Sequence, residues 1–217
     1  MSDFAAARRM MVDGQIRTSA VTDLRLIAAM LDIPRERFVP PEQVPLAYLD
    51  LDLPVGDGAH GRRLLKPMVQ AKLIQAAEIA ETDHVLDVGC ATGYSSAILA
   101  RLAASVIGLE QDRGLARQAG EHLRSLPNVT IVAGTLAAGH PAAAPYDVIL
   151  VNGSGETVPQ ALLRQLKDGG RLIGVIGRGP GKATVYRRDG EMFGGRPVFD
   201  AAAPALPGFA KAPAFAF

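Results

Sequence analysis

The stretch VLDVGCATGYSSAILA (residues 85–100) joins a short apolar strand pattern to a helical pattern through a loop with two glycines. The strand pattern ends at Asp87-Val88-Gly89, and the helical pattern starts just after Gly93. Glycine lets a backbone turn sharply and lets a ligand approach it closely, and the start of a helix presents free N–H groups. The stretch therefore predicts a ligand site where a strand meets a helix.

A second strand pattern, SVIGLE, ends at Glu110, about 20 residues after Gly89. A carboxylate at this spacing, at the end of the second strand, typically hydrogen-bonds the hydroxyls of a ribose. A dinucleotide site would favour the pattern G-x-G-x-x-G, but the run here is GCATG. The spacing therefore predicts a nucleoside-like ligand that is not a dinucleotide.

Strand and helix patterns alternate over residues 67–178, and the strand patterns are nearly continuous apolar runs. Such alternation is typical of an α/β fold with a doubly wound, mostly parallel sheet that is covered on both faces. Pro67 suits the first turn of a helix, with Val69, Leu73, Ala76 and Ala80 on one face. The expected strands cover residues 84–89, 105–110, 128–134, 146–154 and 169–177, and the later helices residues 94–103, 112–125 and 158–166.

The flanking segments have a different character, and we expect them to form one compact domain with the core. Residues 1–66 predict a helical cover and a substrate loop, including a helix over residues 23–31 with Leu24, Ile27, Ala28 and Leu31 at helical spacing. Residues 179–217 contain two alternating runs around Asp189-Gly190, a common hairpin signal. The Ala- and Pro-rich tail is either a disordered end or a segment that docks by its aromatic rings.

Composition narrows the class of protein. The chain has 217 residues, 48% hydrophobic, with a formal net charge of +1. This charge argues against a nucleic-acid partner, which needs a strongly basic face, and no apolar run is long enough to span a bilayer. A single cysteine, Cys90, fits a reducing compartment. We therefore expect a cytoplasmic protein, with a monomer as the default.

The pattern Asp-x-Gly-x-x-x-Gly at residues 87–93 resembles motif I of the class I methyltransferases, which use S-adenosyl-L-methionine and release S-adenosyl-L-homocysteine. A narrower resemblance covers most of the chain. The pieces IPRERFVP, LPVGDG, VLDVGCATGYSSAILARLA and APYDVILVNGSGETVPQALLRQLKDGGRLIGVIG are similar to those of the protein-L-isoaspartate O-methyltransferase family. This resemblance implies a Rossmann-like methyltransferase fold, an adenosylmethionine site, and isoaspartyl carboxylates of damaged proteins or peptides as acceptors.

The resemblance and the spacing together indicate a set of cofactor-binding residues on the strand ends and loops. These are Leu64, Leu65, Gln70, Asp87, Gly89, Cys90, Ala91, Gly93, Tyr94, Glu110, Gln111, Thr135, Leu136 and Asn152.

The sequence departs from the family pattern at three places. Typical members carry Thr-Ile-Ser-x-Pro before the helix at Pro67, and the serine is assigned an active-site role; here Arg63 and Leu65 take the threonine and serine positions. The aspartate expected after the third strand is Thr135. The alanine-rich stretch after the fourth strand is NGSG (residues 152–155). The catalytic residue is therefore left unassigned.

The chemistry of a carboxylate acceptor tolerates these losses. A carboxylate is already ionised at neutral pH, because its pKa is about 4, so it needs no general base to attack a methyl group. Catalysis then rests mainly on alignment. Arg62, Arg63 and Lys66 can hold an anionic acceptor through charge-assisted bonds, or they can be solvated loop cations.

The single cysteine and the four histidines are further candidates for chemistry. Cys90 can be a reactive thiol at a helix N-terminus or a residue that fills the loop beside the ligand. His60, His84, His122 and His140 lack the spacing of metal ligands, so we expect no metal site.

Two hypotheses of function remain open from the sequence. The first is an active methyltransferase for isoaspartyl carboxylates or for a related small carboxylate or hydroxyl acceptor. The second is a non-catalytic adenosylmethionine-binding protein whose acceptor loop serves regulation or partner binding. Leu65 favours the second hypothesis or a changed acceptor, whereas the cofactor loop and Glu110 suit both.

Overall fold

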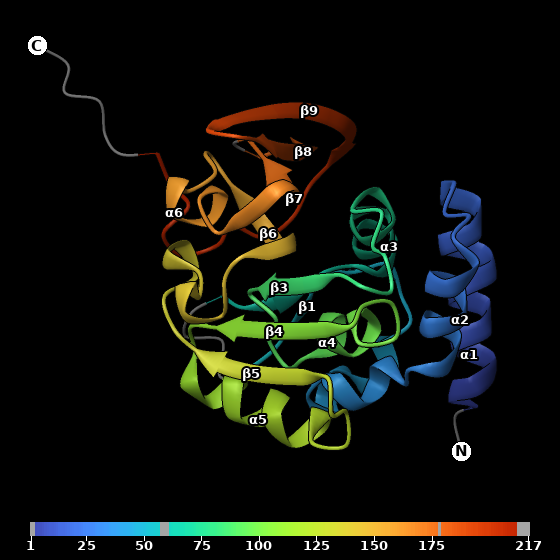
Figure 1. Ribbon diagram of the computed structural model, residues 1–217. Coiled ribbons are helices and arrows are strands. Elements are labelled where there is room, and N and C mark those ends of the chain that lie inside the picture. Colours follow the sequence, from blue (N-terminus) through green and yellow to red (C-terminus); the bar gives the residue numbers. More distant parts are fainter. Residues whose placement is uncertain (1–2, 57–60, 178, 212–217) are drawn as a thin grey trace, which may run out of the picture.

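A seven-stranded sheet forms the centre of the computed structural model, which describes residues 3–56, 61–177 and 179–211 (Figure 1). Its strand order is β5-β4-β3-β6-β7-β8-β9. The first five strands in this order are parallel, and the last two join antiparallel. The bounds are β3 His84–Val88, β4 Ser105–Glu110, β5 Val129–Ala133, β6 Tyr146–Gly155, β7 Leu166–Ile176, β8 Gly181–Asp189 and β9 Met192–Ala201. The predicted doubly wound, mostly parallel sheet is confirmed.

Two apolar clusters cover the two faces of this sheet. Side chains alternate along a strand, so Val85 of β3 joins the larger cluster and the adjacent Leu86 joins the smaller one. The larger cluster contains residues of the N-terminal helices, and the smaller one contains Leu162 and Phe209. The helices that follow the strands are α3 Pro67–Ala76, α4 Tyr94–Leu99, α5 Arg113–Leu123 and α6 Gln160–Leu163.

The N-terminal cover is helical, as predicted, and lies beside α3 and α4 (Figure 1). It contains α1 Phe4–Met11, η1 Val12–Ile16, η2 Arg17–Ser19, α2 Leu24–Asp32, η3 Arg35–Phe38 and η4 Pro41–Leu46, followed by the short strands β1 Leu53–Pro54 and β2 Arg63–Leu64. The predicted buried face of α2 is wrong, since Leu24 is 74% exposed and Ala28 is exposed, while Leu26 and Met30 are buried with Ile27. The segment is apolar at every position from Leu24 to Leu31 except Arg25, so periodicity could not fix which side packs inward.

Three of the predicted helices are shorter than expected. The one over residues 158–166 is reduced to α6, because Leu166 already pairs with Tyr146 as part of β7. Helix α3 ends at Ala76, and the left-handed Glu78 (φ 50°) turns the chain away, leaving Ala80 exposed. Helix α4 likewise ends at Leu99.

The C-terminal hairpin forms as predicted, with Asp189 of β8 paired to Met192 of β9. The chain then runs back to the end of β6, where Ala205 forms a parallel bridge with Ser154. Phe209 is 2% exposed in the smaller apolar cluster, so the described part of the tail docks through an aromatic ring. Phe215 and Phe217 lie outside the described residues.

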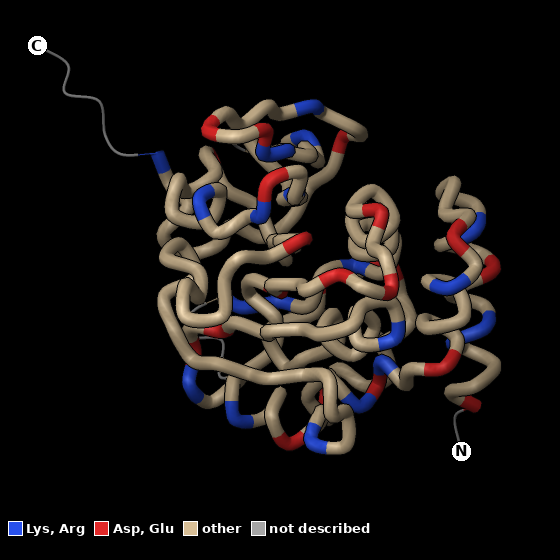
Figure 2. The backbone as a smooth tube through the Cα atoms, in the orientation of Figure 1, with Lys and Arg blue, Asp and Glu red and all other residues tan. Residues whose placement is uncertain are grey.

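Basic and acidic residues are interspersed along the chain (Figure 2). Within the described ranges, no helix combines the length and the apolar character that crossing a membrane requires.

The division into residues 1–66, 67–178 and 179–217 stays a proposal about organisation, since β7, β8 and β9 pair within one sheet.

Candidate cofactor and acceptor site

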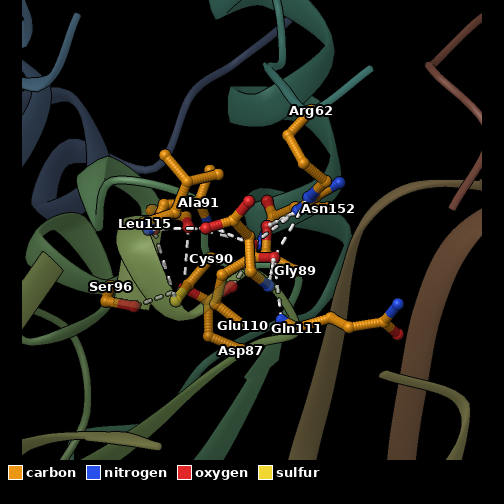
Figure 3. A network of polar contacts seen from close by, with 12 residues as sticks. Arg62, Asp87, Gly89, Cys90, Ala91, Ser96, Glu110, Gln111, Leu115 and Asn152 are labelled. Atoms are coloured by element: carbon orange, nitrogen blue, oxygen red, sulfur yellow. Dashed lines mark hydrogen bonds and ion pairs between the residues drawn. The ribbon is translucent and has the colours of Figure 1, made fainter. Parts of the chain in front are cut away.

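The carboxylate of Glu110 is the centre of a buried polar network at the carboxyl end of β4 (Figure 3). The residue is 0% exposed. Its Oε2 accepts from the backbone N–H of Ala91 at 2.8 Å, and its Oε1 accepts from those of Gln111 and Asp112 at 2.8 and 3.1 Å. The predicted ribose acid therefore lies beside the predicted loop.

The loop from Gly89 to Gly93 takes the sharp path that its glycines predict. Gly89 and Gly93 have φ of 77° and 98°, and Ala91 has φ of 52°. Gly93 precedes α4, and a Cβ there would lie 2.7 Å from Leu123 of α5. The conformation of Ala91 explains why a glycine suits this position, because the left-handed region strains any residue with a Cβ by roughly 1–2 kcal/mol.

Replacing Ala91 with glycine is therefore expected to raise the free energy of unfolding. Relief of the left-handed strain is partly offset by the greater freedom of glycine in the unfolded chain, which leaves a gain of roughly 0.5–1 kcal/mol. Urea unfolding of Ala91→Gly and wild type measures this gain. A loss of stability would show that the buried methyl group of Ala91 contributes more than the strain costs.

Asp87 lies at the end of β3 and is fully buried. Its Oδ2 accepts from the hydroxyls of Ser95 and Ser96 at 2.7 and 2.5 Å, and its Oδ1 accepts from the amide of Asn152. Asn152 in turn accepts from Gln70 Nε2 at 3.2 Å. Three predicted cofactor residues on β3, β6 and α3 thus form one connected cluster.

Burial raises the pKa of Asp87 to about 6, against the lowering effect of the hydrogen bonds from Ser96, Ser95 and Asn152. The folded protein therefore binds this proton more tightly than the unfolded chain, whose pKa is near 3.8. The resulting stabilisation is fully present below pH 4 and is lost as the pH rises through about 6.

Comparison of wild type with Asp87→Asn isolates this effect, because asparagine does not titrate. We expect the stability advantage of wild type over the variant to fall by roughly 2 kcal/mol between pH 4 and pH 7, at about 1.4 kcal/mol per pKa unit, because the unfolded chain is already partly ionised at pH 4. Urea unfolding of both proteins across that range measures the change. A difference that stays constant with pH would contradict the raised pKa.

The predicted adenine-side residues border open space beyond Glu110. A cavity of about 370 Å³ is lined by Gln111, Arg113, Ala133, Gly134 and Thr135. Thr135 is exposed, and Leu136 is buried directly after it. Thr135 and Gln111 are therefore accessible to a ligand, while Leu136 belongs to the smaller apolar cluster.

The three loop cations have different surroundings. Arg62 is 4% exposed and donates to Glu110 from Nε at 3.2 Å and from Nη2 at 2.8 Å, so it is not a solvated cation. Arg63 is exposed and donates to the carbonyl of Asp52 at 3.1 Å. Lys66 is half-buried, with its backbone N–H bound to Asp52 Oδ1 at 2.8 Å.

Leu64 and Leu65 are 4% and 2% exposed and belong to the larger apolar cluster. A buried arginine that holds this loop was not predictable from the sequence pattern. Arg35, which is 0% exposed, donates to the carbonyl of Leu65 at 2.8 Å and to that of Ala47 at 2.9 Å. Its guanidinium lies 4.7 Å from the ring centroid of Tyr94, so the predicted cofactor residue Tyr94 faces the cover.

Cys90 is buried and free, and burial raises the pKa of its thiol well above the ordinary value, with the charges of Asp87 and Glu110 adding to the effect. A thiolate is therefore disfavoured, which supports the loop-filling interpretation. Among the described residues, no group of three histidine, cysteine or acidic side chains is placed to hold a metal. His60 lies outside the described residues.

Comparisons with known proteins agree with this architecture. The sequence profile described as "Protein-L-isoaspartate(D-aspartate) O-methyltransferase (PCMT)" matches residues 6–194. A protein-L-isoaspartate O-methyltransferase of Methanoregula boonei is 38% identical over 189 residues, covering 86% of each chain. One of Rhodopseudomonas palustris is 39% identical over 178 residues, covering 81% of this chain and 71% of the relative.

Solved structures show the same fold. A protein-L-isoaspartate O-methyltransferase superposes with a TM-score of 0.82 at 26% identity, covering 93% of this chain and 66% of that one. A Plasmodium falciparum structure, described as a putative enzyme of this kind in complex with S-adenosyl-L-homocysteine, superposes at 0.75 with 18% identity, covering 92% and 97%. The chain belongs to the protein-L-isoaspartate(D-aspartate) O-methyltransferase family, a class of S-adenosylmethionine-dependent methyltransferases.

Proposed function

We propose that this chain binds S-adenosylmethionine across the carboxyl ends of β3, β4 and β5 and methylates an isoaspartyl carboxylate of a protein or peptide. The observation that carries the proposal is the buried carboxylate of Glu110 beside the backbone of the Gly89–Gly93 loop. Parallel α/β sheets bind ligands outside the carboxyl ends of their strands, where such a carboxylate meets ribose hydroxyls.

The polar groups of the cleft fit this cofactor. Glu110 supplies acceptors for two hydroxyls, and the cavity beside Gln111 and Thr135 offers room for an adenine ring. At the other end, Gln70 Oε1 is buried without a hydrogen-bond partner. A buried orphan acceptor is costly, so a donor such as the amino group of the methionine part suits it.

When bound, S-adenosylmethionine supplies a methyl group on a positively charged sulfur. In this proposal Asp87, Asn152 and Gln70 hold the amino-acid end, and an amine beside Asp87 favours the ionised form of that carboxyl. Arg63 and Lys66 attract the acceptor carboxylate. No base is required, because the acceptor is already ionised at neutral pH, so the work of the site is alignment.

A second candidate, a non-catalytic adenosylmethionine-binding protein, is favoured by one observation. Leu65, at the family serine position, is 2% exposed within the larger apolar cluster and presents no hydroxyl to an acceptor. Both candidates require the same cofactor site, so they differ only in methyl transfer.

A methyl-transfer assay with an isoaspartyl peptide, run beside the normal aspartyl peptide, separates the two candidates. Calorimetry with S-adenosylhomocysteine measures the cofactor site independently. Under the first candidate, Arg63→Gln and Lys66→Gln raise KM for the peptide, whereas Arg187→Gln, an exposed arginine of β8, does not. Cofactor binding without transfer selects the second candidate, and absence of binding overturns both.

The cellular setting follows from the same proposal. The free, buried Cys90 accords with a reducing compartment, so we place the protein in the cytoplasm. There, methylation of isoaspartyl residues would serve the repair of damaged proteins.

A further inference from the structure

We propose that the C-terminal segment Ala203–Phe209 and Arg62 close the ribose and methionine end of the cofactor cleft, so that the cofactor binds only after they move. This inference rests on the proposed cofactor site. It assigns a gating function to a segment beyond residues 6–194, the part that the family profile matches.

Arg62 occupies the place where the ribose is expected. Its Nη2 donates to the carbonyl of Gly89 at 2.9 Å as well as to Glu110 Oε2 at 2.8 Å (Figure 3). A Cβ built on Gly89 would lie 2.9 Å from this Nη2, so the guanidinium covers the glycine that a ligand is expected to approach. Ribose hydroxyls and Arg62 therefore compete for one carboxylate.

Leu206 lies against the same glycine, beside the guanidinium of Arg62. The built Cβ of Gly89 lies 3.4 Å from a methyl group of Leu206. The neighbouring Pro207 and Arg62 line a cavity of only about 110 Å³ together with Gln111 and Asp112. Small-molecule sites start at roughly 300 Å³, so this end of the cleft is too small for a ligand while the adenine end is open.

Hydrogen bonds to β6 hold the segment in place. Ser154 donates from its backbone N–H to Pro204 O at 2.7 Å, and Leu206 donates back to Ser154 O at 2.8 Å. Glu156 donates to Phe209 O at 2.9 Å. An isolated parallel bridge between Ala205 and Ser154 and these backbone hydrogen bonds thus fix the segment at the end of β6.

Two glycines of β6 make room for this segment. A Cβ on Gly153 would lie 2.5 Å from Leu206 Cγ, and one on Gly155 would lie 2.6 Å from Phe209 Cβ. A methyl group at either position would therefore collide with the segment and push it away. The glycines and the docked segment therefore belong together.

The segment also has space into which it can move. A cavity of about 360 Å³ lies between it and the ends of β6 and β7, lined in part by Gly155, Gly177 and Phe209. In this proposal the segment opens before the cofactor binds. The apparent affinity then equals the affinity of the open form multiplied by the fraction of protein that is open. For an open form populated at 10% or less, this reduction is about tenfold or more.

Calorimetry with S-adenosylhomocysteine on the purified full chain and on variants tests the proposal. Deletion of residues 203–217, Gly153→Ala and Arg62→Met are each expected to bind it about tenfold or more tightly than wild type. Two matched controls are expected to bind as wild type does. One deletes residues 212–217 and leaves the docked segment intact, and the other is Gly194→Ala, where a Cβ meets nothing within 4 Å.

Hydrogen exchange supplies a second measurement on unaltered protein, which decides the matter if the long deletion does not fold. Addition of S-adenosylhomocysteine is expected to speed exchange at the amides of Ser154, Glu156 and Leu206, because their partners leave. Slower exchange there, or variants that bind equally to or more weakly than wild type, would overturn the gating proposal alone. If neither wild type nor any variant binds, the cofactor site itself is wrong.

Discussion

Replacing Glu110 with glutamine is expected to lower the free energy of unfolding by about 3–5 kcal/mol, because it leaves the buried guanidinium of Arg62 without its counter-ion. The two side chains are 4% and 0% exposed, so solvent cannot replace the lost charge. In addition, the new amide group faces N–H donors of Ala91, Gln111 and Asp112, which all require an acceptor.

The same substitution is expected to weaken S-adenosylhomocysteine binding by about 100-fold or more. Hydrogen bonds to a charged group contribute roughly 1.5–3 kcal/mol each, and the proposed ribose contact uses two. Urea unfolding gives the first effect, and calorimetry at a temperature where the variant remains folded gives the second.

The control is Glu81→Gln, which makes the same chemical change at an exposed ion pair. Glu81 is 81% exposed and lies 3.8 Å from Arg25, so its loss is expected to cost less than 1 kcal/mol.

Arg62→Met completes a double-mutant cycle with Glu110→Gln, and we expect the double variant to be more stable than the sum of the single losses predicts. Additive losses would mean that the pair contributes no mutual stabilisation.

The position of Glu110 beside the Gly89–Gly93 loop could be predicted from the sequence. Both features depend only on the order of neighbouring strands and helices along the chain. A strand, a glycine turn, a helix and a second strand place the acid of β4 beside Gly89 in any sheet of this topology. By contrast, the partner of Glu110 comes from Arg62, which lies 48 residues earlier on a loop without regular periodicity. No spacing rule connects these two positions.

The docking of the segment Ala203–Phe209 could not be predicted, for a similar reason. Its contact with Gly153 depends on a chain reversal through β8 and β9, and alanine- and proline-rich tails carry no period that would indicate docking. The glycines at residues 153 and 155 were visible as departures from the family pattern. Their meaning requires the position of Leu206 and Phe209, which only the fold supplies.

Restoring the family's hydroxyl by Leu65→Ser is expected to destabilise the protein by about 3–5 kcal/mol and not to create faster transfer. Leu65 is 2% exposed, so the truncation opens a cavity in the larger apolar cluster, which costs roughly 2–5 kcal/mol for a leucine reduced to alanine size. The new hydroxyl adds a desolvation cost of roughly 1–3 kcal/mol where it finds no partner.

Two control variants test whether the loss of stability comes from the burial of residue 65. Leu65→Met preserves the volume and is expected to cost less than about 1.5 kcal/mol, and Leu24→Ser, at a position that is 74% exposed, is expected to change stability by no more than about 0.5 kcal/mol. Urea unfolding and kcat for an isoaspartyl peptide are measured on all three variants. If Leu65→Ser kept wild-type stability and increased kcat, Leu65 would line the acceptor site, and its packing would be secondary. Arg35 donates to the backbone carbonyl of Leu65, not to its side chain, so we expect this hydrogen bond to persist in each variant and a change in kcat to report the side chain.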